Sequence, residues 1–168
     1  MLSLELSDVR NRGILVATVN AVLQALGLVT GTIHCRDEDP SNCGPELARQ
    51  LEARFGSKRF GLIGLQPAIL KALADHFDPE FIRVVDLDLD NIGSSKYGIE
   101  VWDGQSDLSR LVGWSEVGLA TGSSIVNGTI DKIIRCFKDD DKPLVFFGNT
   151  ISGAAALLDI DRLCPFGR

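Results

Sequence analysis

The segment at residues 121–131, TGSSIVNGTID, is the richest concentration of small, hydroxyl and amide side chains in the sequence. It lies between an apolar run that predicts a strand and an apolar repeat that predicts a helix. Glycines let backbone N–H groups approach a ligand, and a helix N-terminus attracts anionic groups. The plainer alternative is that Ser124 or Asn127 only caps the following helix. The candidate ligand-binding residues here are Thr121, Gly122, Ser123, Ser124, Asn127, Gly128 and Thr129.

Polar side chains also follow three other predicted strands. Gln66 follows the first strand, Asp86 the second, and Asn149 and Thr150 the fourth. In open α/β sheets, ligands bind beyond the carboxyl ends of the strands. We therefore expect these residues to line one binding site together with the 121–129 segment.

The region around Asp86 leaves two further interpretations open. Gly61 and Gly64 precede Asp86 by roughly 20 residues, which loosely matches the dinucleotide-binding fingerprint, but the third glycine is missing. A nucleoside-containing ligand such as S-adenosylmethionine is therefore an alternative. Asp86, Asp88 and Asp90 would point to one side of an extended segment and could hold a hard cation. The alternative is a solvated loop in which Asp86 alone belongs to the site.

His34, Cys35 and Cys43 are the candidate metal ligands, because thiolate and imidazole suit zinc, copper, nickel and cobalt. Seven residues separate these two cysteines, which is not a zinc-finger spacing. Cys164 could join them only if the fold brings it close. The alternative is that these thiols are small buried or loop residues, as we expect for Cys136 in the core.

Strands that alternate with helices position these loops. Apolar runs predict strands at 60–65, 81–87, 117–120 and 144–147, with shorter extended pieces at 99–102 and 163–166. Helical spacing predicts helices within 7–28, 45–56 (with Pro45 in the first turn), 67–77, 107–112, 130–137 and 153–158. This alternation implies a three-layer, Rossmann-like α/β domain with about five parallel strands. We expect residues 1–168 to form one such domain, with a helical part at 1–57 and a βα core at 58–168.

The overall composition excludes several classes of function. The net charge of −6 argues against a nucleic-acid-binding protein, which presents a basic surface. No apolar run approaches the roughly 20 residues of a membrane helix, so we expect no membrane partner. The N-terminal residues lack the basic start and apolar centre of a secretory signal. The sequence therefore predicts a cytosolic protein.

Three motifs resemble the heavy-metal-chelation domain family. TGSSIVNGTIDKII resembles its signature, in which TG, two small and two apolar residues precede NGT and an apolar helix. FGLIGLQPAIL and ATVNAVLQAL resemble its first strand and its alanine-rich helix with an internal asparagine, here Asn20. The resemblance covers roughly residues 14–166. It implies a Rossmann-like domain, often joined to an enolase-like N-terminal domain, with a heavy-metal site at the junction and a link to anaerobic cofactor metabolism.

The resemblance and the strand-end loops lead to one hypothesis. We expect a protein that binds a heavy-metal ion (nickel, cobalt, zinc or copper) or a metal-containing small molecule. Asn20 is expected to orient a neighbouring loop. The chain leaves no room for the enolase-like domain, so we expect a second copy or a partner chain to replace it. The alternative is an enzyme that binds S-adenosylmethionine or another nucleotide in cofactor metabolism.

Overall fold

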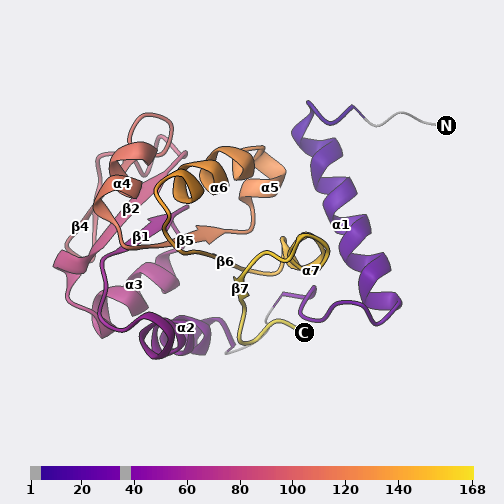
Figure 1. Ribbon diagram of the computed structural model, residues 1–168, viewed down its shortest axis with the longest axis horizontal. Helices are drawn as coiled ribbons and strands as arrows, with labels where there is room; N and C mark the ends of the chain where they lie inside the picture. Colours follow the sequence, from indigo (N-terminus) through magenta and orange to yellow (C-terminus); the bar gives the residue numbers. More distant parts are fainter. Residues whose placement is uncertain (1–4, 35–38) are drawn as a thin grey trace.

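The computed structural model describes residues 5–34 and 39–168, and within them seven strands form one sheet in the order β3-β4-β2-β1-β5-β6-β7 (Figure 1). The strands are β1 (Phe60–Ile63), β2 (Ile82–Asp86), β3 (Ser95–Lys96), β4 (Ile99–Asp103), β5 (Val117–Thr121), β6 (Leu144–Phe147) and β7 (Arg162–Leu163). β3 pairs antiparallel with β4, and the other pairings are parallel. The predicted Rossmann-like α/β class is confirmed.

The helices cover both faces of this sheet and its carboxyl edge. They are α1 (Val9–Ala25), α2 (Asp39–Phe55), α3 (Pro67–His76), the 3-10 turn η1 (Pro79–Phe81), α4 (Leu108–Trp114), α5 (Ser124–Asn127), α6 (Ile130–Asp139) and α7 (Ser152–Leu158). In Figure 1, α2 and α3 lie below the sheet and α4 and α6 lie above it. The molecule therefore has the predicted three layers.

The central strands are apolar without alternation because both of their faces are covered. All four residues of β1 are buried, as are the first four of β5. Phe60 and Leu62 face the core beneath α2 and α3, whereas Ile63 faces the core beneath α4 and α6. Two separate hydrophobic layers thus hold β1 and β5 rigidly side by side in the middle of the sheet.

Helix α2 starts earlier than its sequence suggests. A start near Pro45 was expected, because proline favours the first helical turn, but the helix begins at Asp39 and contains Pro45 in its interior. The expected start was wrong because tertiary packing dominates here. A Cβ atom on Gly44 would lie 2.8 Å from both the Ala68 carbonyl oxygen and Ala72 Cβ. Close contact between α2 and α3 thus compensates for the hydrogen bond that proline cannot donate.

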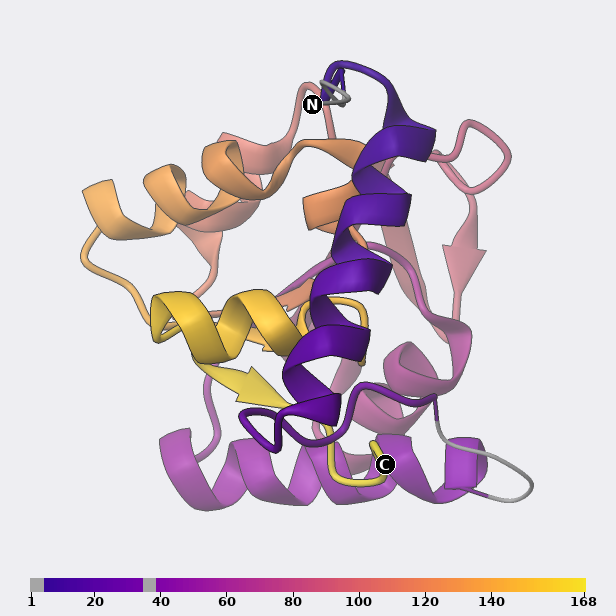
Figure 2. The same cartoon turned by 90° about the vertical axis from the view of Figure 1, so that its right-hand side faces the viewer.

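Helix α1 lies across the carboxyl edge of the sheet, where it contacts α5 and α7 (Figure 2). Its N-terminus is capped by Asp8, whose carboxylate accepts hydrogen bonds from the backbone N–H groups of Arg10 and Asn11. The Arg12 side chain donates to the Val126 carbonyl oxygen at 2.6 Å and so ties α1 to α5. No helix among the described residues is both long and apolar enough to cross a membrane.

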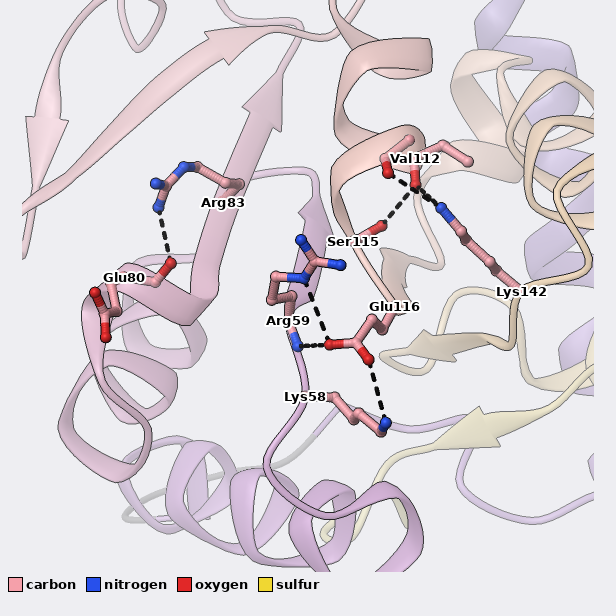
Figure 3. Close-up of polar contacts among 9 residues, drawn as sticks. Lys58, Arg59, Glu80, Arg83, Val112, Ser115, Glu116 and Lys142 are labelled. Atoms are coloured by element: carbon pink, nitrogen blue, oxygen red, sulfur yellow. Dashed lines mark hydrogen bonds and ion pairs between the residues drawn. The ribbon is translucent and has the colours of Figure 1, made fainter.

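The opposite edge of the sheet is held together by charged side chains (Figure 3). The Glu116 carboxylate forms ion pairs with Lys58 at 3.1 Å and Arg59 at 3.5 Å, and it also accepts a hydrogen bond from the Arg59 backbone. Lys142 donates to the Val112 carbonyl oxygen at 2.6 Å, next to the end of α4. These charged groups have partners within the protein, and the polar loops of the carboxyl edge are the candidate site.

Candidate functional site

Strands β1 and β5 form the topological switch point of the sheet. They are adjacent, with Ile63 paired to Ala120, but β1 leads to α3 on one face and β5 leads to α5 and α6 towards the other. The two loops touch at Gly64, which has a φ of +89° and whose added Cβ would lie 2.4 Å from Thr121 Cγ2. Ligands bind in the crevice at such switch points.

A larger cavity of about 890 Å³ lies over the ends of β1, β2, β4 and β5, and this volume is within the usual range for small-molecule sites. Its wall contains hydroxyl, amide and carboxylate side chains from separate loops. The lining residues that were predicted from the sequence are Gln66, Asp86, Thr121, Ser123, Ser124, Asn127 and Thr129. The fold therefore brings loops after three separate strands together around one hollow.

A smaller cavity of about 220 Å³ lies next to the larger one, over the ends of β5, β6 and β7. Gln66, Thr121 and Ser123 line both cavities and form a shared wall. The other predicted residues in the smaller cavity are Gly122, Asn149, Thr150, His34 and Cys43. The single expected site is thus divided into two adjoining compartments.

Asp86 occupies the end of β2, with much of its hydrogen-bonding capacity used by the protein itself. Its carboxylate accepts hydrogen bonds from the backbone N–H groups of Leu65 and Asp88 and, at 3.4 Å, from the Asn91 side chain. The strand stops at Asp86, and Asp90 follows in an exposed turn. A hard-cation site at Asp86, Asp88 and Asp90 required an extended segment with all three carboxylates on one side. The segment is not extended beyond Asp86, so this interpretation was wrong.

The 121–129 segment contains the short helix α5, which no sequence pattern predicted. Asn127 Oδ1 accepts hydrogen bonds from both the backbone N–H and the hydroxyl of Thr129, and thereby fixes the turn between α5 and α6. Gly128 ends α5 beside Arg12. Ser124 is 1% exposed, and its hydroxyl has no hydrogen-bond partner among the described residues, so it does not cap a helix.

Asn20 orients the loop that follows β6. It is buried on α1, donates to the carbonyl oxygens of Asn149 (3.2 Å) and Thr150 (3.0 Å), and accepts from the Gly153 backbone N–H at 2.7 Å. The Asn149 side chain in turn donates to the Thr32 carbonyl oxygen at 2.9 Å. Asn20 itself faces a groove of about 600 Å³ along α1, so it positions the loop from behind the smaller cavity.

The candidate soft-metal ligands are partly brought together. His34 and Cys43 line the smaller cavity, Cys164 joins them from the segment after β7, and Cys35 lies outside the described residues. Across residues 5–34 and 39–168, no group of three or more His, Cys, Asp or Glu side chains is arranged to hold a metal ion. Cys136 packs against the core between α4 and α6, where it was expected.

Sequence reasoning missed one wall of the larger cavity. Gly104 and Gln105 line it from the loop after β4, Leu108 from the start of α4, and Lys132 from α6. The Lys132 ammonium donates to the Gln105 carbonyl oxygen at 3.1 Å and adds a positive charge to a cavity that Asp86 also lines. The short extended piece that became β4 was the available signal, because a strand implies a strand-end loop.

Two carboxyls away from both cavities have lowered pKa values. Hydrogen bonds from Arg49 and Gln50 lower the pKa of Glu46 to about 2. Hydrogen bonds from the Arg59 backbone and from Lys58 lower the pKa of Glu116. Both groups are at the surface, so these shifts describe local ion pairing rather than the chemistry of the site.

The fold and the cavities define a class: an open, doubly wound α/β domain with two adjoining cavities at its switch point. The chain belongs to the DUF364 family, which carries the description "Putative heavy-metal chelation". The model of this family matches residues 49–160. None of the curated proteins matches the chain.

Two solved structures are similar to the chain. A DUF364 protein of unknown function from Pyrococcus horikoshii is 18% identical with a TM-score of 0.58, over 85% of this chain and 50% of its own. A second, from Desulfitobacterium hafniense DCB-2, is 13% identical with a TM-score of 0.48, over 67% of this chain and 40% of its own. The chain thus spans half or less of the length of these relatives, and the Pyrococcus structure supports the fold alone.

Proposed function

We propose that this protein is a cytosolic ligand-binding protein that takes up a heavy-metal ion or a metal-containing small molecule at the carboxyl ends of its strands. The observation that carries the proposal is the pair of joined cavities with chemically different walls. Family membership supports the metal, since the family description is that of heavy-metal chelation.

The larger cavity has the features needed to hold the organic or anionic part of such a ligand. The Ser124 hydroxyl is buried and lacks a partner among the described residues, and a buried polar group without a partner costs free energy. A ligand atom that hydrogen-bonds to this hydroxyl would remove that cost. Lys132 offers a positive charge, while Asn127 and Thr129 offer exchangeable hydrogen-bonding groups on the same wall.

Calorimetric titration of the reduced protein with nickel, cobalt, zinc and copper ions tests the metal. Asn127→Ala is the matched variant because it removes an exposed side chain that lines the larger cavity. Elemental analysis and mass spectrometry of anaerobically purified protein would identify what co-purifies. No binding of any of the four metals above buffer level, together with no co-purifying small molecule whose retention Asn127→Ala reduces, would contradict the proposal.

A nucleotide-binding enzyme is the second candidate, and the position of Asp86 favours testing it. Asp86 lines the larger cavity after β2, where a ribose-binding acid is found in dinucleotide-binding folds. Thermal stabilisation by S-adenosylmethionine or adenine nucleotides, lost in Asp86→Ala, would support this candidate. A nucleoside that stabilises wild type and Asp86→Ala equally would exclude this role for Asp86.

The proposal includes a second chain, either another copy or a partner, against the outer face of α1. Ile14 and Val22 on this helix and Leu26 at its C-cap are 58%, 51% and 65% exposed, and exposed apolar patches are typical of protein–protein contact surfaces. Light scattering at several protein concentrations tests the homo-oligomer. A strictly monomeric protein that retains full ligand binding would contradict the need for a second chain.

A further inference from the structure

The smaller cavity collects sulfur and imidazole side chains from three segments that are distant in the sequence. His34 comes from the segment before α2, Cys43 from α2 itself, and Cys164 from the tail after β7. The view in Figure 2 places the C-terminal tail over α2, beside the segment that follows α1. Three independent parts of the fold therefore contribute soft donor groups to the lining of one cavity.

Backbone contacts hold the tail that carries Cys164 in place. Ile33 and Arg168 exchange two backbone hydrogen bonds, at 2.7 and 3.1 Å. Gly167 packs against Gly31, and a Cβ atom added to Gly167 would lie 3.0 Å from Cys164 Sγ and 3.1 Å from the Gly31 carbonyl oxygen. The sulfur of Cys164 therefore lies beside the Gly167 backbone, and the residue lines the smaller cavity.

Both cysteines are half-buried, which suits a metal-binding thiol better than full burial or full exposure. A thiolate is a soft ligand and selects Cu(I) and other thiophilic ions over hard cations. Cu(I) is satisfied by two thiolates, so it does not require the group of three or more donors that is missing from the described residues. The cavity is also small, at about 220 Å³, which suits an ion or one end of a ligand rather than a whole cofactor.

We propose that Cys43 and Cys164 are the metal-binding residues of this site and that they bind a thiophilic ion, represented by Cu(I), as a pair of thiolates. Two S–H bonds are lost, two Cu–S bonds form and two protons pass to solvent, with no change in oxidation state. His34 lines the same cavity but does not complete a three-ligand group with the two cysteines. This inference rests on the proposed function, because it names the donors of the same site.

Competition between the reduced protein and bicinchoninate for Cu(I) measures the affinity without oxygen. Cys43→Ser and Cys164→Ser are each expected to weaken binding by more than the roughly 10–100-fold that loss of an outer-shell partner causes. Cys136→Ser is the matched control, because Cys136 packs in the α4–α6 core and should leave the affinity unchanged. Thermal unfolding of each variant separates loss of binding from loss of folding.

Alkylation of the wild type, followed by mass spectrometry, gives a second measurement that requires no variant. Bound Cu(I) should protect Cys43 and Cys164 together, with one ion per protected pair. Protection of Cys35 with either one of them instead, or unchanged affinity in folded Cys164→Ser protein, would overturn the inference. Absence of metal binding in the wild type would remove the metal form of the proposed function as well, whereas tight binding in both cysteine variants would overturn the inference alone.

Discussion

Replacement of Asn20 by alanine should loosen the loop after β6, which lines the smaller cavity. Asn20 is 8% exposed and makes two hydrogen bonds to the β6–α7 loop and one to Gly153 in the first turn of α7. In Asn20→Ala the buried Gly153 N–H loses its partner, which costs about 1–3 kcal/mol, and the lost bond to Thr150 adds about 1 kcal/mol. Asn149 keeps its bonds from Ser152, so its carbonyl oxygen adds little. The expected loss is about 2–4 kcal/mol.

Urea denaturation of wild type and Asn20→Ala measures this loss as a change in the free energy of unfolding. Thr18→Ala is the matched control on the same helix, because Thr18 is exposed and its hydroxyl bonds only within α1, to Ile14. The control should change stability by less than about 0.5 kcal/mol. If Asn20→Ala loses no more unfolding free energy than Thr18→Ala, the hydrogen bonds of Asn20 do not stabilise the loop as we infer.

Asn20→Asp separately tests the two hydrogen bonds that Asn20 donates to the Asn149 and Thr150 carbonyl oxygens. A carboxylate keeps an acceptor for Gly153 but faces the carbonyl oxygens of Asn149 and Thr150, so its charged form is disfavoured and its pKa should be raised. The penalty is then present at neutral pH and relieved as pH falls through the raised pKa, where the protonated group can donate. Stability of Asn20→Asp relative to wild type should therefore improve on acidification. A difference that does not vary with pH would contradict this account.

Three further predictions concern the strand ends and the surface. Gly64→Ala should be strongly destabilising because the new methyl group would lie 2.4 Å from the Thr121 side chain. Gly98→Ala is the control, since Gly98 has a similar φ of +79° but open space around it, and it should cost only about 1–2 kcal/mol. Thermal unfolding compares the two variants. Asp86→Asn turns an N–H group towards a backbone donor and should cost about 1–3 kcal/mol in urea denaturation; equal stability would show that the two loops are not joined there. The pKa of Glu46 is lowered from 4.5 to about 2, so its stabilising effect is present above pH 4.5 and disappears as pH falls towards 2. Glu46→Gln should therefore unfold with a shallower dependence on pH in this range, measured as melting temperature against pH, and an unchanged slope would contradict the ion pair.

Much of the fold could be predicted because its central strands and amphipathic helices have long apolar signals. The strand Leu144–Phe147 was predicted with its observed bounds, and α3 and α6 were predicted within two residues. Short or polar elements could not be predicted. β3 has two exposed polar residues and α5 has four residues, so neither has a hydrophobic period to detect.

The candidate site was predictable as a set of loops but not as two compartments. The rule that strand ends share an edge was enough to group Gln66, Asp86 and Asn127. The division depends on β1 and β5 being neighbours and on the tail that carries Cys164, and both are long-range features that local patterns do not encode. The ligand-binding roles of these residues stay predictions.

The wall common to both compartments has a thermodynamic consequence. Gln66, Thr121 and Ser123 cannot rearrange for an occupant on one side without changing the surface offered on the other. If the proposed ligands occupy both cavities, we expect the two binding equilibria to be energetically linked, and such linkage is reciprocal. An ion that raises the affinity for an organic ligand by some factor would then have its own affinity raised by the same factor when that ligand is bound.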